Sequence, residues 1–453
     1  MFDWTYHRLG KIIRPFVSAL LLVCMAASRS EPSADQSNTA ALTGLRCDPD
    51  NGGIQLPGGF CAITVADNLG RARHLTVNDN GDIYVALRRP SEGGGIVALR
   101  DTTGDGKADI EKRFGALGGT GIDIRRGYLY FAADTVVLRY RLMEGKLVPP
   151  GSPDTVAKGF PVQRQHRAKP FAFDAEGWMY VNIGGPSNAC QEQVRTRGSP
   201  GMDPCPQLKR HAGIWRFKAD QLEQTQASDG YRYATGIRNA VAIAWNPISR
   251  NLYVVQHGRD QLHELWPDLY TVKQNAELPA EEFLLVENGS NFGWPYCYYD
   301  HIQGKRVLAP EYGGDGKKVG RCDRFGDPMM SFPGHWAPND LLFYTGEQFP
   351  EHYKGGAFIA FHGSWNRAPL QQRGYKVVFV PFNRRLPSAD GKVFAEGFAG
   401  VEIIKSPRDA RFRPMGLAQG PDGSLYISDS VQGRIWRVIY TGTEKKSAPQ
   451  VAQ

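Results

Sequence analysis

A short phrase, in which a turn with glycine or asparagine leads into an apolar and aromatic run, occurs six times along this sequence. The first copy is NGDIYVA at 80–86. The aromatic residues at the centres of the six copies are Tyr84, Tyr130, Tyr180, Tyr253, Phe358 and Tyr426. Such turns between short apolar runs are strong signals of β-hairpins. We therefore expect a fold built from repeated antiparallel strands.

Further strands flank the phrase, because apolar runs such as 75–77 precede the turn and runs such as 95–99 follow it. The first three copies stand 46 and 50 residues apart, which suits one propeller blade with modest loops. Three or four antiparallel strands per unit, repeated radially, are typical of a propeller. We predict an all-β fold, a six-bladed β-propeller, with the six aromatic residues on equivalent strands. A β-sandwich is the alternative.

The two ends of the chain differ from this repeat. Three basic residues precede an apolar run at 16–27, and small residues follow it, as in an export signal. An uncleaved membrane anchor and a lipid on Cys24 are the alternatives. The organisation that we predict is a signal peptide at 1–30, a flexible linker at 31–44, the propeller at 45–440 with an insertion at about 270–330, and a disordered tail at 441–453.

Export places the protein in the periplasm or outside the cell, and membrane contact is expected only through the signal or a lipid anchor. Apart from Cys24, six cysteines remain, in three sequence-local couples. Six cysteines allow 15 pairings, but oxidising compartments favour disulfides. Because each couple closes a short loop, we predict the pairs Cys47–Cys61, Cys190–Cys205 and Cys297–Cys322. Free thiols are the alternative.

The formal net charge of +8 comes without a dense run of Lys and Arg interleaved with aromatic residues. Nucleic-acid binding therefore has no support, and a small anionic ligand suits the charge better. The acidic run at 101–109 has spacings like those of an EF-hand loop but lacks the closing glutamate. We expect a polar turn there.

Loops at one end of a propeller channel converge from all blades, so chemistry is expected between the strands. His166, just before the third copy, can act as a general base, or it belongs to a solvated basic loop. Arg238 and Asn239 precede the fourth copy and offer a planar fork for a carboxylate beside an amide. A blade-capping role is the alternative for that pair.

Two more loops follow strands. Gly258 and its neighbours come directly after the fourth copy, and a glycine lets backbone carbonyls turn toward calcium; a tight turn is the alternative. The loop at 362–367, HGSWNR, and the preceding pair at 335–336, HW, suit stacking on a flat ring, or else these side chains belong to the core. Arg411 and Arg413 add two cations before the last copy.

Together, five segments resemble those of the soluble PQQ-dependent sugar dehydrogenases, in particular the sorbosone-dehydrogenase-like branch. These segments are 166–180, 236–239, 291–295, 362–367 and 413–429. The resemblance covers about residues 45 to 440. It implies a six-bladed propeller that holds PQQ, a flat ortho-quinone with three carboxylates, and calcium at one end of the channel.

The resemblance also implies roles for single residues. His166 matches the general base and Arg238 the arginine at the reacting oxygens. Gln165 stands where the glucose enzymes carry an aspartate, and no lysine lies at 358–362, so that His362 or Arg367 takes its place. The other implied contacts are Asn239, His362, Arg367, Arg411 and Arg413 for the cofactor, Gln165, His335, Trp336 and Trp365 for the substrate, and the carbonyls of Gly258 and Arg259 for calcium.

We therefore expect an oxidoreductase that depends on PQQ and calcium and oxidises a sugar or sugar aldehyde by hydride transfer to the quinone. The electrons would pass to an acceptor such as a quinone or a cytochrome c. Two alternatives stay open, because fold alone does not decide function. One is a calcium-dependent lactone hydrolase, which needs several carboxylates on one metal. The other is a periplasmic propeller that binds carbohydrate without chemistry.

Overall fold

The computed structural model describes residues 44–442. The predicted signal peptide, nearly all of the linker and most of the tail lie outside these residues. Within 44–442, no helix is both long enough and apolar enough to cross a membrane.

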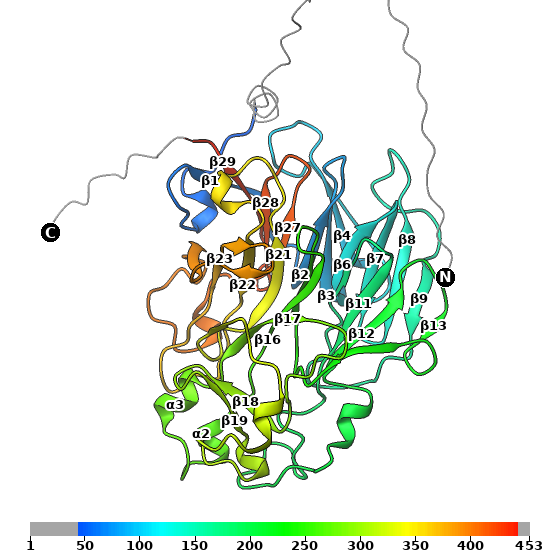
Figure 1. Ribbon diagram of the computed structural model, residues 1–453. Coiled ribbons are helices and arrows are strands. Elements are labelled where there is room, and N and C mark those ends of the chain that lie inside the picture. Colours follow the sequence, from blue (N-terminus) through cyan, green and yellow to red (C-terminus); the bar gives the residue numbers. More distant parts are fainter. Residues whose placement is uncertain (1–43, 443–453) are drawn as a thin grey trace, which may run out of the picture. The chain divides into compact units, whose positions relative to one another are not determined.

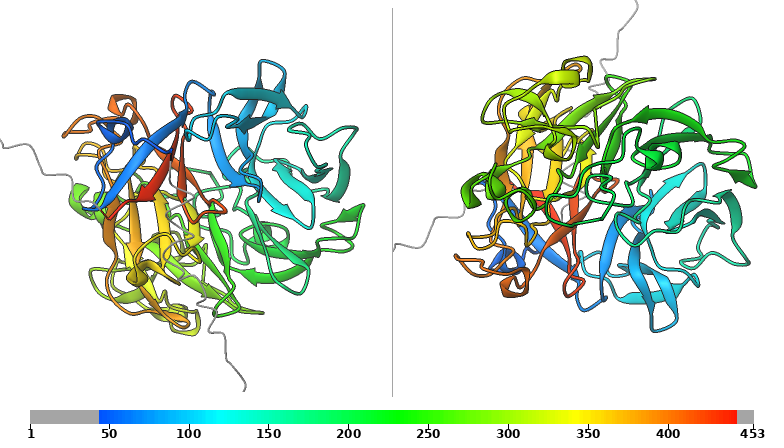
Figure 2. Two further views of the ribbon diagram at one scale, coloured as in Figure 1. Left: turned by 90° about the horizontal axis from the view of Figure 1, so that it is seen from above. Right: turned by 90° about the horizontal axis from the view of Figure 1, so that it is seen from below.

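Six four-stranded antiparallel sheets, one of them extended by a fifth short strand, surround a central channel (Figure 1), and Figure 2 shows them from the two ends. The blades, each from its inner strand outward, are β2 (Ala72–Val77), β3 (Ile83–Ser91), β4 (Gly94–Arg100) and β5 (Ile110–Phe114); β6 (Gly119–Arg125), β7 (Tyr128–Ala133), β8 (Val136–Arg141) and β9 (Asp154–Lys158), with β13 (Gln224–Thr225) added; β10 (Phe171–Phe173), β11 (Trp178–Ile183), β12 (Gly213–Lys218) and β14 (Tyr231–Thr235); β15 (Ala242–Asn246), β16 (Asn251–Gln256), β17 (Glu281–Val286) and β20 (Met330–Phe332); β21 (Pro338–Phe343), β22 (Ala357–Phe361), β23 (Lys376–Val380) and β26 (Lys392–Ala395); and β27 (Pro414–Gln419), β28 (Leu425–Asp429), β29 (Ile435–Tyr440) and β1 (Phe60–Ala66). The predicted six-bladed propeller is confirmed.

The repeated aromatic residues occupy the second strand of every blade, one per sheet, as predicted. Their burial explains the repeat. The hydroxyl of Tyr84 donates to Leu147 O in the next blade, and Tyr130 and Tyr253 make the same kind of contact one and three blades further on. A buried tyrosine needs a partner for its hydroxyl, so each of these rings both fills the core and fixes the neighbouring blade.

The ring closes where the two ends of the propeller meet. β1 pairs antiparallel with β29, from Phe60 opposite Tyr440 to Ala66 opposite Ile435. The N-terminal strand thereby completes the sixth blade. The disulfide Cys47–Cys61 ties the segment before β1 to that strand.

The long stretch between the fourth and fifth copies does not form one continuous insertion. Strand β17 pairs with β16 and β20 inside the range of about 270–330. The additional residues therefore form two loops, 257–280 with helices α2 (Leu262–Leu265) and α3 (Val272–Glu277), and 287–329 with the hairpin of β18 (Cys297–Asp300) and β19 (Lys305–Leu308). Figure 1 shows α2, α3, β18 and β19 together at one end of the propeller, which we call the loop end.

Short elements complete the fold. They are the hairpin of β24 (Phe382–Asn383) and β25 (Leu386–Pro387) and the 3-10 turns at Asn51–Gly53, Pro206–Lys209, Pro310–Tyr312, Gly320–Arg324, Glu351–Tyr353 and Pro407–Asp409. The disulfides Cys190–Cys205 and Cys297–Cys322 are also present. With Cys47–Cys61, all three predicted pairs form.

Candidate cofactor and substrate site

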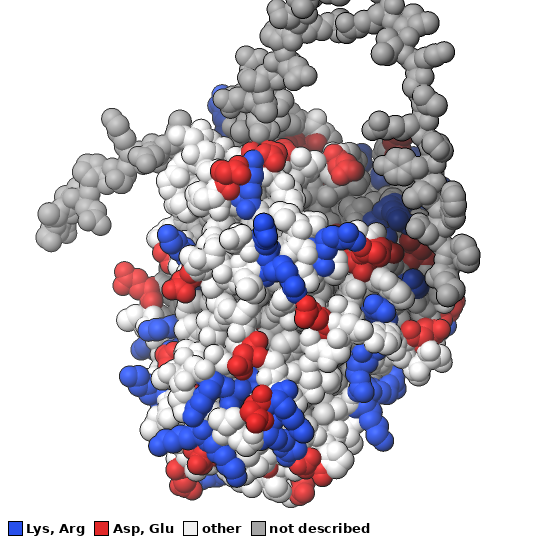
Figure 3. Space-filling view, in the orientation of Figure 1, with Lys and Arg blue, Asp and Glu red and all other residues white. Residues whose placement is uncertain are grey.

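The predicted site residues come from two equivalent places in successive blades. His166, Arg238 and Arg413 precede the inner strands β10, β15 and β27, whereas Gly258 and His362 follow the second strands β16 and β22. The start of one strand and the end of its antiparallel neighbour lie at the same edge of a sheet. These residues therefore gather at the loop end of the channel, where Figure 3 also shows Lys and Arg side chains on the surface.

His166 is held as a neutral imidazole. Its Nδ1–H donates to Gly185 O at 2.6 Å, and since a carbonyl only accepts, the lone pair lies on Nε2. Burial, and next the nearby charge of Arg238, lowers the pKa of His166 to about 3. The residue has φ +49°, and a Cβ on Gly184 would approach its Cβ to 2.6 Å. A general base must be unprotonated and within reach of the proton that it abstracts, and the fixed Nε2 meets the first of these conditions.

Arg238 is the centre of a buried network. Its guanidinium donates to Asn188 O at 3.1 Å, Asn188 Oδ1 at 3.0 Å, Gly258 O at 2.7 Å and Asp260 Oδ2 at 2.9 Å. Asp260 also accepts from Arg195 at 2.7 Å and from Asn366 at 2.8 Å. Burial alone would raise the pKa of Asp260, but Arg238 and Arg195 hold it well below its usual range. The carboxylate is therefore ionised and fully engaged.

Two further predicted residues border this network. Gln165 Oε1 accepts from Arg195 Nη2 at 3.3 Å, and Asn239 Oδ1 accepts from Asn182 at 3.4 Å. The backbone carbonyl of Asn239 accepts from the N–H of His257 at 2.9 Å. Gln165 and Asn239 thus lie at the edge of the Arg238 network.

A group of cations, which we call the cation cluster, lies at the same end of the channel and consists of Arg73, Arg88, Lys169 and Arg413. Burial, followed by repulsion from Arg88 and Arg413, lowers the pKa of Arg73 to about 9. Lys169 is completely buried, and burial lowers its pKa to about 8. Its Nζ donates to Arg167 O at 2.7 Å. The shifts show that these groups hold their protons at a cost.

Nearby acidic groups balance only part of the positive charge of the cation cluster. Asp134 lies 3.1 Å from Arg88 and 3.4 Å from Arg167, and it also raises the pKa of Lys169. Arg413 donates its side-chain N–H groups to the carbonyls of His362 and Gly363, which carry no charge. Asp340 and Asp429 also act on Arg73 and Arg413, and with Asp134 they set three acidic groups against four cations. An anionic ligand could supply the remaining negative charge.

The sequence did not single out Arg73 and Lys169. Arg73 lies on β2, at the start of the first blade, close to Arg413 at the start of the sixth. Aligning the six repeats by their inner strands would have placed it. Lys169 stands three residues after His166, but a buried lysine cannot be told from a solvated one by its neighbours in sequence.

Histidines also surround the channel at this end. The Nε2–H of His257 donates to Pro338 O at 2.7 Å, and burial lowers the pKa of this ring to about 4. His362 Nε2 lies 2.6 Å from Ser430 Oγ, and burial with the charge of Arg413 holds its pKa well below the usual range. These rings are neutral at pH 7 and can bind hydroxyl groups without adding charge.

The structure does not bring all of the predicted residues to the site. The guanidinium of Arg367 donates to Glu277 at 2.6 Å and to the carbonyls of Ala276 and Gln371. It anchors α3 and has no free fork for a carboxylate. Arg411 is exposed, with its guanidinium 4.9 Å from the Phe412 ring.

Three predicted substrate residues likewise have other surroundings. His335 is buried and lies 2.8 Å from Asn275 O, at α3. Trp336 packs edge-on against Phe361 with the ring centroids 5.3 Å apart. Trp365 is 52% exposed. Sequence patterns could not separate these core and surface roles from ligand contact, because the same residue types serve both.

One of the two expected calcium ligands, Gly258 O, is already engaged in this arrangement, because it accepts from Arg238. The other expected ligand is the carbonyl of Arg259, whose side chain is paired with Glu311. Calcium takes six to eight oxygen ligands. Within residues 44–442, no group of three or more His, Cys, Asp or Glu residues could hold a metal ion.

A cavity of about 810 Å³ lies away from these residues. It is bordered by Asn78–Asn80, Arg126 and Trp245, at the end of the channel opposite the loop end. None of the predicted site residues borders it. The polar site and this cavity thus occupy opposite ends of one channel.

Comparison with known proteins assigns the chain to a family. Residues 54–441 match the family described as TrAA12-like. The chain belongs to the TrAA12-like family. A PQQ-dependent pyranose dehydrogenase of Coprinopsis cinerea is 26% identical over 282 residues, which are 53% of this chain and 36% of the relative. An uncharacterised protein of Borreliella burgdorferi is 31% identical over 209 residues, 46% of this chain and 48% of the relative. The chain thus spans half or less of these curated relatives.

Solved structures share the fold of this TrAA12-like protein. The holo form of the pyranose dehydrogenase PQQ domain from Coprinopsis cinerea has a TM-score of 0.67 at 19% identity, with 85% of this chain and 97% of that chain covered. The calcium structure of the Trichoderma reesei family AA12 protein has a TM-score of 0.69 at 19% identity, with 88% and 99% covered. These likenesses show the fold of the propeller, and they do not distinguish the sorbosone branch.

Proposed function

We propose that this TrAA12-like protein is a PQQ-dependent oxidoreductase that oxidises a sugar or sugar aldehyde. The observation that carries the proposal is the undercompensated cation cluster beside the neutral His166. The three carboxylates of PQQ would supply the negative charge that the cation cluster lacks, and His166 would accept the proton of the substrate hydroxyl group. The relative from Coprinopsis cinerea is itself a PQQ-dependent pyranose dehydrogenase.

The cation cluster would hold the cofactor. Arg73, Lys169 and Arg413 offer N–H donors with positive charge, and charge-assisted bonds are about twice as strong as neutral ones. An anion beside Lys169 would also raise its lowered pKa back toward the usual value. When bound, PQQ would supply an electrophilic quinone that accepts a hydride.

His166 would act on the substrate. With Nδ1–H fixed on Gly185 O, Nε2 is free to accept the proton of the hydroxyl group that becomes a carbonyl. The low pKa keeps this nitrogen unprotonated throughout the neutral range. Arg238, whose charge reaches His166, would stabilise negative charge on a reacting oxygen.

We derive no step through calcium, since the loop at Gly258 does not present a ligand set for it. The lactone-hydrolase alternative needs several carboxylates on one metal, and Asp260 is instead bound by two arginines and an asparagine. A periplasmic or secreted location agrees with three disulfides. An electron acceptor such as a quinone or cytochrome c stays a prediction.

The test is reconstitution of the purified full chain with PQQ, followed by addition of aldoses and sugar aldehydes. We expect saturable PQQ binding and reduction of the quinone, seen as an absorbance change, by at least one of these sugars. Binding of sugar without reduction would instead support the carbohydrate-binding alternative. Failure to bind PQQ would overturn the proposal.

A further inference from the structure

We infer that the guanidinium of Arg238 takes the place of a divalent cation at the Gly258 loop, so that this protein binds PQQ without calcium. Only the part of the inference that concerns PQQ binding rests on the proposed function. Occupation of the loop by Arg238 is a property of the protein alone and can be tested without cofactor.

The Gly258 peptide is held on both sides. Its N–H donates to Glu281 Oε2 at 2.9 Å, and its carbonyl accepts from Arg238 Nη1 at 2.7 Å. Glu281 in turn accepts the N–H of Ala337 at 3.0 Å. The oxygen that would be a calcium ligand is therefore aimed at a cation that the chain already provides.

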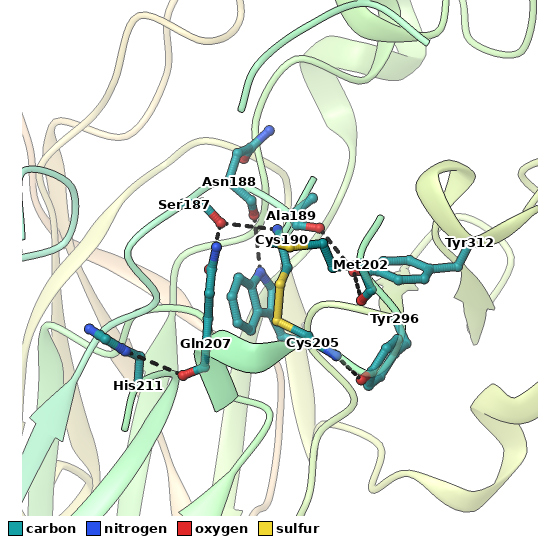
Figure 4. The surroundings of a disulfide bond; sticks show 11 residues. Ser187, Asn188, Ala189, Cys190, Met202, Cys205, Gln207, His211, Tyr296 and Tyr312 are labelled. Atoms are coloured by element: carbon teal, nitrogen blue, oxygen red, sulfur yellow. Dashed lines mark hydrogen bonds between the residues drawn. A yellow bond between two sulfur atoms is a disulfide. The ribbon is translucent and has the colours of Figure 1, made fainter. Parts of the chain in front are cut away.

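Arg238 is not free to leave this position. Only 3% of the residue is exposed, and Asn188 accepts from it with both its backbone and its side-chain oxygen. The Nε1–H of Trp294 donates to the same backbone carbonyl at 3.0 Å. Figure 4 shows Asn188 two residues before Cys190, where Ser187 Oγ accepts the N–H of Cys190. The disulfide Cys190–Cys205 thus supports the segment that fixes the arginine.

The charges around Gly258 oppose a further cation. Asp260 is shared by two guanidinium groups, those of Arg238 and Arg195. Both guanidinium groups would repel a calcium ion placed at Gly258 O, because like charges repel strongly where water is excluded. A calcium ion would first have to displace Arg238 from both Gly258 O and Asp260.

The guanidinium can perform the electrostatic task of the metal. Arginine has five N–H donors in a planar fork. Four of them are engaged by Asn188, Gly258 and Asp260, so one N–H of Nη1 has no acceptor within residues 44–442. That N–H is available to an oxygen of bound PQQ, where a fixed donor stabilises developing negative charge.

Calorimetric titration of the metal-depleted full chain with calcium alone is the first experiment. We expect no saturable binding up to about 1 mM calcium, the weak end of known calcium sites, and no change in melting temperature. Stoichiometric calcium binding that raises the melting temperature would overturn the inference, whatever the outcome with PQQ.

PQQ titration with and without calcium is the second experiment. We expect the PQQ dissociation constant to differ by less than about twofold between EDTA and calcium, whereas a tenfold tightening by calcium, about 1.4 kcal/mol, would overturn the inference. PQQ that binds in neither condition contradicts the proposed function instead, and the calcium titration still decides the inference.

Two variants complete the test. Arg238→Ala frees Gly258 O and removes one of the three donors to Asp260, so we expect calcium to bind this variant and raise its melting temperature. Arg195→Gln is the matched control, because it removes a charge from Asp260 but leaves the contact between Arg238 and Gly258, and we expect it to stay insensitive to calcium. Calcium binding by Arg195→Gln would contradict the inference even if Arg238→Ala fails to fold.

Discussion

Replacement of Lys169 by methionine should stabilise the protein without PQQ and weaken PQQ binding. The side chain is completely buried, and its pKa falls from 10.5 to about 8. At about 1.4 kcal/mol per pKa unit, keeping the ammonium charged costs roughly 3 kcal/mol. Methionine has a similar length and no charge, but it loses the bond to Arg167 O, worth about 1 kcal/mol. We expect a net gain of about 2 kcal/mol in the free energy of unfolding at pH 7.

The same substitution removes a charge-assisted contact to a PQQ carboxylate. Such a bond contributes about 1.5 to 3 kcal/mol, so the PQQ dissociation constant should rise about 10- to 150-fold. Urea unfolding of the apoprotein and a PQQ titration measure the two effects. Lys112→Met, at an exposed position on β5, is the control and should change neither. A less stable variant with unchanged PQQ affinity would refute the reasoning, because Lys169 would then be a structural ammonium.

The sign of the pH dependence follows from the lowered pKa. Between pH 8 and 10.5 the unfolded chain keeps a proton on Lys169 that the folded protein has lost, so this residue's contribution to stability rises with pH in that window. Its destabilising effect is fully present below pH 8. The stability advantage of Lys169→Met should therefore shrink above pH 8, and beyond about 10.5 only the lost bond to Arg167 O should remain, as a deficit of about 1 kcal/mol.

Three other predictions concern the site. His166→Gln should lower turnover at saturating PQQ by about 100- to 10,000-fold with PQQ affinity unchanged; wild-type turnover would place the base elsewhere. Because the pKa of His166 is about 3, kcat/KM should not fall through protonation of the base between pH 7 and 5. An inflection near pH 6.5 in the wild type that is absent from the residual activity of His166→Gln would instead mean that the ring is solvated. Arg413→Ala should weaken PQQ, as seen by titration, with activity restored at high cofactor; unchanged affinity would remove Arg413 from the cofactor site.

The fold was predictable from sequence because the repeated phrase encodes a local contact. In three copies the tyrosine that follows the turn bonds to the next blade, as Tyr84, Tyr130 and Tyr253 do, so the same residue gives the sequence signal and the packing contact. Strand β17 escaped prediction for the opposite reason. It begins with Glu281 and Glu282, which read as surface residues, yet both are buried, and Glu282 is paired with Arg306. Only tertiary contacts can make such a segment a core strand.

The candidate site was predictable in part. His166 and Arg238 could be found because they directly precede inner strands, where a propeller directs residues to the channel. The arginines could not be sorted, since a guanidinium looks the same in sequence whether it meets a ligand or a local carboxylate. Arg367 pairs with Glu277, whereas the guanidinium of Arg413 donates to the neutral carbonyls of His362 and Gly363.

Closure of the sixth blade by β1 has a consequence for cofactor binding. Arg73 lies on β2, the strand that follows β1 in the chain, and Arg413 lies at the start of the blade that β1 completes. The charge of Arg413 nevertheless lowers the pKa of Arg73 across the join. A ligand held by both arginines spans the junction between the chain's two ends. Binding and ring closure are then thermodynamically linked: whatever PQQ gains from a closed ring, the join between β1 and β29 gains from PQQ. If PQQ binds as proposed, its removal should weaken the pairing of β1 with β29, which lies far along the sequence from His166.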